Sequence, residues 1–549
     1  MNSIVVPILL PAFTAIVLAL LRGNFRAQKI ISAVSSLVLT CFAFWLLYFV
    51  NGSGIQTSFI GGWEVGEASQ PFGIVFVADR LACIMLCLSA SVGTVVMFYT
   101  FWTVTEKQQR YFFYALFQVV LMGVNWSFLT GDLFNLFVAY EVMLIGSYGM
   151  MMVGASKAQV RQTMKYIGIN TIGSTFFVVA VGLIYATVGS TNMAAIAERT
   201  ALLEGDQAAL VTACSTVLLV VFTMKTAAFP LFFWLPDSYP VVPVGVNGYF
   251  AGLLTKVGVY SLLRVFVMVF QQPGQEFALN ILLILSCFTM PLGVLGAMCQ
   301  WEIRKILSWH IISQVGYMVM GIGLCGSADS RVVTLAITGT IFYIVHHIIV
   351  KSCLFLVGGI TERVTGTQEL KKMGGVLDLA PGVAGLFLIA AFSLAGMPPF
   401  SGFLSKFVLV KAGLAGGAFI VVTVAIVTSF FTLYSMTKIW AYAFWRDKCR
   451  EKSRPNYRGM MIPTGVLVAF TVVMGLFAQP FVKLAEDAAK DVSDTSAYIE
   501  AVMGNRTTTP SEPDVTVDSN HDAKDAHVLE AAITDKRRQA SATAQGGAR

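Results

Sequence analysis

The sequence predicts an all-α polytopic membrane protein of about 14 transmembrane helices, for three reasons. Of the 549 residues, 56% are hydrophobic and only 12% are charged, where a soluble domain has about 25% charged residues. The mean hydropathy is +0.74, and apolar segments recur as far as about residue 484. Most of the cations lie in short loops between those segments. One helical bundle therefore uses nearly the whole chain, and no segment predicts a soluble catalytic domain.

The individual spans follow from length, because a transmembrane helix needs about 20 mostly apolar residues. The segments that meet this requirement are, in order, 3–21, 30–50, 79–104, 111–129, 131–153, 165–188, 209–235, 243–269, 277–300, 304–324, 333–359, 382–412, 416–444 and 459–482. The first three spans form an N-terminal group (1–110), and the last (459–482) stands alone.

Lysine and arginine are concentrated in alternate loops between the predicted spans. The loops after odd-numbered spans are basic, and their cations include Arg22, Arg26, Lys29, Lys107, Arg110, Lys157, Arg161, Arg446, Lys448, Arg450, Lys452, Arg454 and Arg458. The loop near 51–78 carries Glu64 and Glu67 but no cation. By the positive-inside rule we expect the odd loops to be cytoplasmic and both termini to face outward from the cell membrane. The net charge of +7 therefore does not indicate a nucleic-acid partner.

Three charged residues interrupt apolar segments deep in the expected membrane. Glu141 and Lys256 are central in their spans, and Lys225 lies about 4.5 Å past the centre of 209–235. The hydrocarbon core has a half-thickness of about 15 Å, so a lysine at this depth does not reach the interface. A charge there costs roughly 2.5 to 3.5 kcal/mol on insertion scales and usually marks a function. The alternative is an ion pair that only ties helices together.

Lys406 and Lys351 lie further from the centres of their spans. Lys406 is in the second half of 382–412, and Lys351 is about 7 Å past the centre of 333–359. For Lys406, snorkelling of the side chain to the interface is an alternative to a buried functional role.

Prolines interrupt two spans: Pro230 and Pro236 the seventh, and Pro398 and Pro399 the twelfth. Proline kinks or breaks a helix, and a broken helix at membrane depth persists where it lines a cavity or packs in protein. The two spans are five apart, so helices 4–8 (111–269) and 9–13 (277–445) match as two five-helix repeats. An odd repeat length makes the repeats inverted. The alternative is kinking without function.

The eleventh span contains FYIVHHIIVKSCLF, which brings His346, His347 and Lys351 together. His347 and Lys351 are four residues apart, on one face of a helix. Histidine can take up and release protons near neutral pH. A proton relay is favoured over a packed polar pair. A haem or metal ligand is the weakest alternative, because a metal site needs more converging ligands and the chain has only five histidines. His310 is a weaker candidate because it lies near the start of a span.

Two further features have no predicted chemistry. The nine cysteines lie mostly inside spans without CxxC spacing, so we expect neither a disulfide nor a metal site. Segment 484–549 is assigned as a polar C-terminal tail that is expected to be disordered. Its last part, from about Asn505 to Arg549, has little to bury and is expected to be disordered.

Six stretches together resemble one family, the antiporter-like subunits shared by Mrp cation/proton antiporters and respiratory complex I. They are FVAYEVMLIGSYG, KTAAFPLFFWLPDSYP, AGLLTKVGVY, RKILSWHIISQVGYM, HHIIVKSCLFLVGG and SLAGMPPFSGFLSK. The resemblance covers about residues 60–445 and is greatest to the branch of D-type subunits of the Mrp antiporter, whose usual end is similar to AYIEAVMG. It implies two inverted five-helix repeats with helices 7 and 12 broken. It also implies a polar chain at mid-membrane through Glu141, Lys225, Lys256, the His346–His347 pair and Lys406.

A mechanism follows from this implied chain. Glu141 and Lys225 would form a switchable ion pair, in which the carboxylate stabilises the charged lysine. When the pair opens, burial disfavours the ammonium group, and the proton moves toward Lys256 and on to Lys406. No cofactor is needed for these steps, and none is expected.

We therefore expect a proton-translocating subunit of a multisubunit monovalent cation/proton antiporter, with Na⁺ as the cation. The expected partners are a large A-type subunit with several small membrane subunits, and the protein is expected to be a secondary transporter subunit, not an enzyme. The alternative is a proton-pumping membrane subunit of a complex I-like NADH dehydrogenase or a membrane-bound hydrogenase. A stand-alone membrane enzyme or a scaffold is a third hypothesis, although the chain lacks a cofactor motif.

Overall fold

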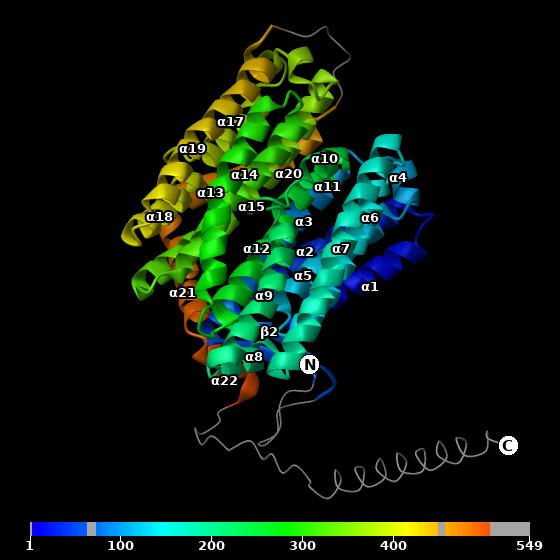
Figure 1. Cartoon of the computed structure of the whole chain (residues 1–549). Coiled ribbons are helices and arrows are strands. Elements are labelled where there is room, and N and C mark those ends of the chain that lie inside the picture. Colours follow the sequence, from blue (N-terminus) through cyan, green and yellow to red (C-terminus); the bar gives the residue numbers. More distant parts are fainter. Residues whose placement is uncertain (1–2, 63–72, 448–455, 505–549) are drawn as a thin grey trace, which may run out of the picture. The chain divides into compact units, whose positions relative to one another are not determined.

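A computed structural model of the chain describes residues 3–62, 73–447 and 456–504, which are mostly helical (Figure 1). The N-terminal part contains α1 (Val6–Leu20), α2 (Phe25–Ser53), strands β1 (Gln56–Phe59) and β2 (Val75–Ala78), α3 (Arg80–Thr100) and α4 (Glu106–Arg110). Next come α5 (Phe113–Leu129), α6 (Leu133–Met152), α7 (Lys157–Val188), α8 (Met193–Thr200), α9 (Gly205–Thr226), α10 (Leu235–Ser238), α11 (Val244–Tyr249) and α12 (Thr255–Leu263). They are followed by α13 (Glu276–Cys299), α14 (Ile303–Gly323), α15 (Ser330–Thr365), α16 (Val376–Leu379), α17 (Pro381–Ala395), α18 (Ser401–Ala415) and α19 (Phe419–Ile439). The last described helices are α20 (Arg458–Leu476), α21 (Ala478–Ser493) and α22 (Ser496–Met503).

Twelve helical segments of the described chain are long and apolar enough to cross a membrane, and each lies at a predicted span. The other two predicted spans fall on α5, which has 17 residues, and on the pair α17 and α18, which have 15 residues each. The chain is a multi-pass membrane protein, and the total of fourteen crossings stays a prediction.

The seventh predicted span does not continue as one helix. α9 ends at Thr226, and Ala227 adopts the left-handed conformation with φ of 60°. The chain then turns through Pro230 before α10, in which Pro236 occupies the first turn. Because a left-handed residue cannot continue a right-handed helix, α9 ends directly after Lys225 and its neighbour Thr226.

The twelfth predicted span is divided into α17 and α18. Gly396 ends α17 with φ of 89°, a conformation that glycine adopts without steric cost. Pro398 and Pro399 lie in the linker that follows, which ends where α18 begins. Both interruptions fall within apolar sequence.

Each of the two predicted five-helix units contains a backbone contact of the same kind at a matching position. In the first unit, Asp132 at the start of α6 forms an isolated β-bridge with Asn192, just after α7. In the second unit, Glu302 at the start of α14 forms the same kind of bridge with Glu369, after α15. α8, which follows Asn192, lies at the lower end of the view, whereas the segment between α15 and α16 lies at the upper end (Figure 1). This is the arrangement that an inverted repeat would produce.

Close helix packing recurs at the same interval of 170 residues. A Cβ on Gly123 in α5 would lie 2.5 Å from the backbone nitrogen of Met143 in α6. A Cβ on Gly293 in α13 would lie 2.3 Å from the backbone nitrogen of Ser313 in α14. Only glycine permits this approach, so the sequence sets the spacing of both helix pairs in the same way.

The polar tail that we assign to 484–549 is wrong for its first part, because α21 and α22 are ordered helices. On α21, Ala485, Ala488, Ala489 and Val492 are buried at helical spacing, and the helix packs on α15 and α3. Phe481, Ala485, Ala488 and Val492 recur at the spacing of an amphipathic helix, so periodicity could have identified α21, although its mean hydropathy is too low for a membrane span. The expected disorder of 505–549 concerns residues outside those that the structure describes.

An ion pair and a contact between a guanidinium group and an aromatic ring connect these C-terminal helices to the rest of the bundle. Arg80 of α3 pairs with Asp491 of α21 at 2.6 Å. Arg264 pairs with Asp79, both nearly fully buried, and its guanidinium carbon lies 5.6 Å from the ring centre of Tyr498 in α22. The C-terminal helices are therefore integral to the fold.

Candidate functional site

The first group of ionisable residues joins α6, α7 and α9. The Ser174 hydroxyl donates a short hydrogen bond to Glu141 Oε1 and lies 3.4 Å from Lys225 Nζ. Lys225 also donates to the side-chain oxygen of Asn170 at 3.2 Å and is only 5% exposed. The lysine therefore extends sideways from the last turn of α9 to α7.

The expected ion pair of Glu141 and Lys225 is not a direct contact. Ion pairs within 4.0 Å among the described residues do not include these two, because the Ser174 hydroxyl lies between them. The two charges are still close enough to interact electrostatically. A hydroxyl can accept from the ammonium group while it donates to the carboxylate, so the contact is a bridged pair.

The second group begins at Lys256, which is fully buried. Its ammonium group donates to Ala251 O at 2.8 Å and to Thr255 Oγ1 at 3.1 Å. Ala251 lies in a π-helical turn, Phe250–Leu254, where the backbone hydrogen bonds shift by one residue. This irregular turn presents a carbonyl group to the lysine.

Lys351 lies next to Lys256 on the neighbouring helix α15. It is fully buried, and its ammonium group donates to Leu307 O of α14 at 3.1 Å. Gly252 permits the contact between the helices, since a Cβ there would lie 2.4 Å from Ser352 Oγ. The charges of Lys256 and Lys351 affect each other, and both lysines disfavour a positive charge on His347.

The three histidines are fully buried in the same region. His346 Nδ1 lies 2.9 Å from Ser401 Oγ, at the start of α18, and His310 Nε2 lies 2.9 Å from Ser435 Oγ of α19. Among the described residues, neither ring nitrogen of His347 has a hydrogen-bonding partner. Buried polar atoms of this kind usually bind protein groups or ordered water.

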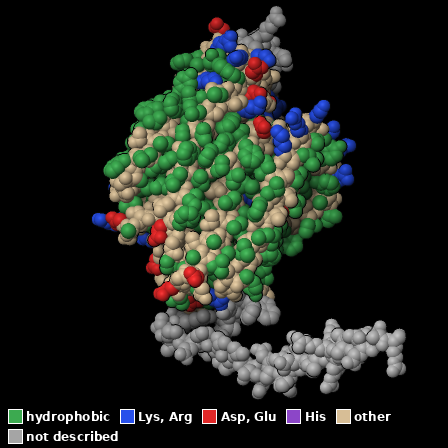
Figure 2. Space-filling view, in the orientation of Figure 1, with side chains coloured by type: hydrophobic (Ala, Val, Ile, Leu, Met, Phe, Trp, Pro, Cys, Tyr) green, Lys and Arg blue, Asp and Glu red, His purple; other side chains and the backbone are tan. Residues whose placement is uncertain are grey.

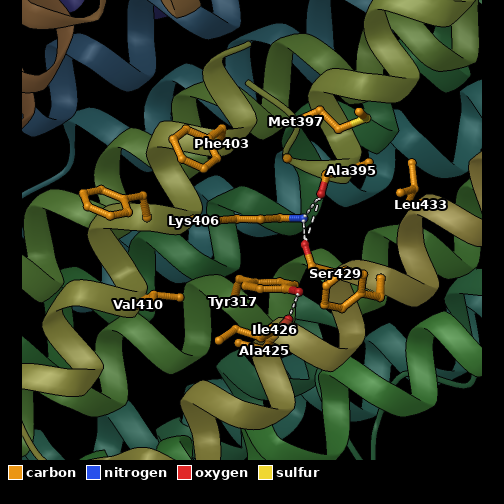
Figure 3. A pocket seen from close by; sticks show the side chains of 13 residues that line it. Tyr317, Ala395, Met397, Phe403, Lys406, Val410, Ala425, Ile426, Ser429 and Leu433 are labelled. Carbon is orange, nitrogen blue, oxygen red and sulfur yellow. Dashed lines mark hydrogen bonds between the residues drawn. The ribbon is translucent and has the colours of Figure 1, made fainter. Parts of the chain in front are cut away.

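Lys406 lies beside the break between α17 and α18 (Figure 3). Its ammonium group donates to Leu394 O at 3.1 Å, Ala395 O at 2.9 Å and Ser429 Oγ at 2.7 Å. The residue is 8% exposed. The side chain thus extends toward the carbonyl end of α17 and does not snorkel to the interface.

Aromatic rings connect Lys406 to the histidines. Lys406 Nζ is 5.1 Å from the ring centre of Tyr317, which stacks on Tyr343 at 5.4 Å. Tyr343 in turn stacks on His347 at 6.5 Å and donates a hydrogen bond of 2.5 Å to Gln314 Oε1. Tyrosine supplies both an apolar face and a polar hydroxyl at this position.

The candidate residues thus form two groups. Glu141 and Lys225 belong to the first, and Lys256, His346, His347, Lys351 and Lys406 to the second, which His310 joins. The groups meet where α12 packs on the end of α9, since a Cβ on Gly258 would lie 2.9 Å from the backbone nitrogen of Thr226. No hydrogen bond between described side chains links Lys225 directly to Lys256.

Several residues of the two groups carry no distinctive sequence signal. Ser174, Asn170 and Ser429 touch the lysines, and Tyr317 and Tyr343 form the aromatic connection. Hydroxyl and aromatic side chains are frequent in transmembrane helices. The one sequence feature that could have indicated Asn170 and Ser174 is their spacing, since residues four apart lie on one face of a helix.

Fold and site together define a multi-pass membrane protein with ionisable side chains buried along its helical bundle. The family model described as "NADH:quinone oxidoreductase/Mrp antiporter, TM" matches residues 130–432. The chain belongs to this family of transmembrane subunits.

Individual relatives agree with this assignment. The chain is 42% identical to the D subunit of a Na(+)/H(+) antiporter from Alkalihalophilus pseudofirmus, over 91% of this chain and 99% of that protein. A chain in the structure of the Mrp complex from Dietzia sp. DQ12-45-1b superposes with a TM-score of 0.83 at 30% identity, over 92% of this chain and 99% of that one. A chain of the membrane-bound sulfane sulfur reductase, an archaeal respiratory membrane complex, has the same fold, with a TM-score of 0.82 at 23% identity over 91% and 100% of the two chains.

Proposed function

We propose that the chain is the proton-translocating D-type subunit of a multisubunit Na⁺/H⁺ antiporter in the cell membrane. Its partners would be a large A-type subunit with several small membrane subunits, and it would act as a secondary transporter and not as an enzyme. The observation that carries the proposal is the set of buried lysines and histidines, arranged in two groups that meet where α12 packs on α9. Burying so many ionisable residues in a membrane protein is costly and usually marks a path for charge. The name of the relative from Alkalihalophilus pseudofirmus supports Na⁺ as the exchanged cation.

The bridged pair would be the switch. With Ser174 between Glu141 and Lys225, a small shift of α7 separates the ammonium group from the carboxylate. The lysine, still buried, would then lose the nearby negative charge and release its proton. The Ser174 hydroxyl is suited to this step because it can donate and accept at once.

Proton access to this pair is proposed from the basic end of α7. Thr163, Tyr166, Asn170 and Ser174 follow one another at helical spacing, and all four are buried. Lys225 Nζ contacts the last two. Below Ser174 the same face continues with Phe177, which is apolar and fully buried. The stripe therefore favours access from one side of the membrane only.

The second group would pass the proton onward from Lys256. Lys256 and Lys351 are both fully buried, on segments that come into contact at Gly252 and Ser352, and their hydrogen bonds go to backbone carbonyls and a hydroxyl. Like charges disfavour simultaneous protonation, so a proton that arrives at one lysine disfavours the charge on the other. His347, His346 and Lys406 complete the proposed route.

The proposed orientation places both termini outside the cell. Lysine and arginine gather at the upper end of the visible face in Figure 2, and acidic side chains are more frequent at the lower end. Following the positive-inside rule, the upper end would be cytoplasmic. The α1 start and α22 are at the lower end in Figure 1.

The alternative remains a proton-pumping membrane subunit of a redox complex, which the shared fold with the sulfane sulfur reductase chain favours. The neighbouring genes distinguish the two. Small hydrophobic antiporter subunits would support the antiporter, and iron–sulfur and flavin subunits would support the redox complex.

The test of the proposed function is Glu141→Ala in everted membrane vesicles with a pH-sensitive dye. Exchange should be nearly abolished at equal expression, because a general acid–base group typically contributes at least about 100-fold. Glu276→Ala, a change at an exposed glutamate in the first turn of α13, is the matched control and should exchange normally. Exchange near the wild-type level in Glu141→Ala would refute the switch.

A further inference from the structure

The cavity beside Lys406 has a composition that its proposed role in proton transfer does not require. Its volume is about 370 Å³, within the range of small-molecule sites. Most of its lining is apolar, with Phe403, Phe407, Ile426 and Phe430 among the residues. Lys406 is the one charged residue among the described residues that line it (Figure 3).

The cavity opens on the outer face of α18 and α19, where several of its apolar lining residues are exposed in the chain. Phe430 is 68% exposed, Phe407 54% and Ile426 44%, whereas Lys406 at the inner end is 8% exposed. A molecule that enters from the bilayer would therefore meet aromatic and aliphatic side chains first and the ammonium group last.

The depth of Lys406 restricts the polar group of such a molecule. Lys406 is nine residues before the end of α18, or about 14 Å along the helix, close to the half-thickness of the hydrocarbon core. A phospholipid phosphate stays at the interface and does not reach this depth. A carboxylic acid can cross the apolar region in its neutral form.

We propose that this cavity binds a long-chain monocarboxylic acid from the bilayer, with the carboxylate on Lys406 and the alkyl chain among Phe403, Phe407 and Phe430. The acid enters protonated and binds the form of Lys406 that has released its own proton. Transfer of the acid's proton to this uncharged amine gives a carboxylate and an ammonium group joined by charge-assisted hydrogen bonds. Ser429 also lines the cavity: its hydroxyl accepts from Lys406 at 2.7 Å and donates to Ala395 O at 3.0 Å, so it holds the amino group of Lys406 at the inner end of the cavity.

The test is photolabelling of the assembled complex in membrane vesicles with a diazirine-bearing palmitic acid. The matched probes are the corresponding fatty alcohol and a diazirine-bearing phosphatidylglycerol. In the wild type, the acid should label α18 and α19 roughly tenfold more than the alcohol, as expected for a hydrogen bond to a charged group. The phospholipid should show no such preference.

Two variants and one control identify the site. Lys406→Gln should reduce labelling by the acid to the level of the alcohol, and Lys411→Gln, on the same helix but outside the cavity, should leave the preference intact. Val410→Trp keeps Lys406 but fills the cavity, and it should also abolish the preference. Recovery of each variant in the assembled complex confirms folding.

Three results would overturn the proposal: equal labelling by acid and alcohol in the wild type, a retained preference in Lys406→Gln, or stronger labelling by the phospholipid. A photoreactive residue at position 430 that crosslinks to a neighbouring subunit instead of the acid would assign the cavity to a subunit contact and also overturn it. These readouts measure binding, so they do not depend on the proposed transport function.

Discussion

Lys225 and Lys406 both lie at a helix break, but they are stabilised in different ways. Lys225 precedes its break and extends to α7, where Ser174 connects it to the carboxylate of Glu141. Lys406 follows its break and extends back to the last carbonyl groups of α17. A helix C-terminus carries about half a negative charge, so it can stabilise an ammonium group without a carboxylate.

The difference indicates that the two units stabilise a buried lysine by different chemistry. The first site depends on a side-chain bridge that can open. The second depends on the backbone geometry of the break itself, since no acidic side chain is among the described contacts of Lys406. Changes to side chains should therefore be more harmful at the first site, and changes to the backbone at the second.

The largest contrast is expected between Ser174→Ala and Ser429→Ala. Loss of Ser174 removes the hydroxyl that connects Lys225 to Glu141, and exchange should fall about tenfold. Loss of Ser429 leaves Lys406 its two carbonyl acceptors, and exchange should fall only about twofold to threefold. Initial rates in everted vesicles measure both, and equal effects would contradict the distinction between the sites.

A second contrast concerns the backbone at the breaks. Gly396→Ala places a methyl group 2.9 Å from Lys406 Cδ at a φ of 89°, so exchange should fall severalfold and the free energy of unfolding by about 1 kcal/mol. Ala227→Gly should instead increase the free energy of unfolding slightly, since residue 227 already has a positive φ. Denaturation in detergent and vesicle exchange check the pair; a harmless Gly396→Ala would be inconsistent with the backbone-dependent second site.

The smallest effect is expected from removal of the segment beyond Asn505. A chain that ends after Asn505 should assemble and exchange normally, because the sequence beyond it is polar and has little to bury. Tyr498→Ala is the comparison: it removes a buried ring over Arg264 and should lower the free energy of unfolding by about 3 kcal/mol. Thermal denaturation and recovery of the assembled complex distinguish them, and loss of assembly in the truncated chain would assign a docking role to the segment beyond Asn505.

The sequence was sufficient for the membrane class and for the burial of the lysines, because a charge within about 20 apolar residues is costly in lipid and therefore faces the interior of the bundle. Glu141, which was also expected deep in the membrane, is only partly buried. Lys225, Lys256 and Lys351 are all nearly or fully buried, as their positions predict. The direction of Lys406 was less predictable. Its span allowed snorkelling, and only the break at Gly396 brings carbonyl groups within its reach.

The contacts between groups were beyond prediction from sequence. Ser174 bridges Glu141 and Lys225 because α6, α7 and α9 converge, and serine is too common in such helices to single out. The π-helical turn that holds Lys256 depends on tertiary packing. α21 was missed because its mean hydropathy is low, but its apolar residues recur at helical spacing, and this periodicity was a signal that could have identified it.

The central claim is that the buried lysines release protons, and Lys406→Arg tests it most directly. Arginine keeps the positive charge and can bind the same carbonyl groups, but it does not release its proton in proteins. We predict that Lys406→Arg blocks cation/proton exchange in everted vesicles at normal assembly, as Lys406→Ala does, and that Lys406→Glu retains partial exchange with a shifted pH profile. Full exchange in Lys406→Arg would contradict the account, because a fixed charge would then be sufficient.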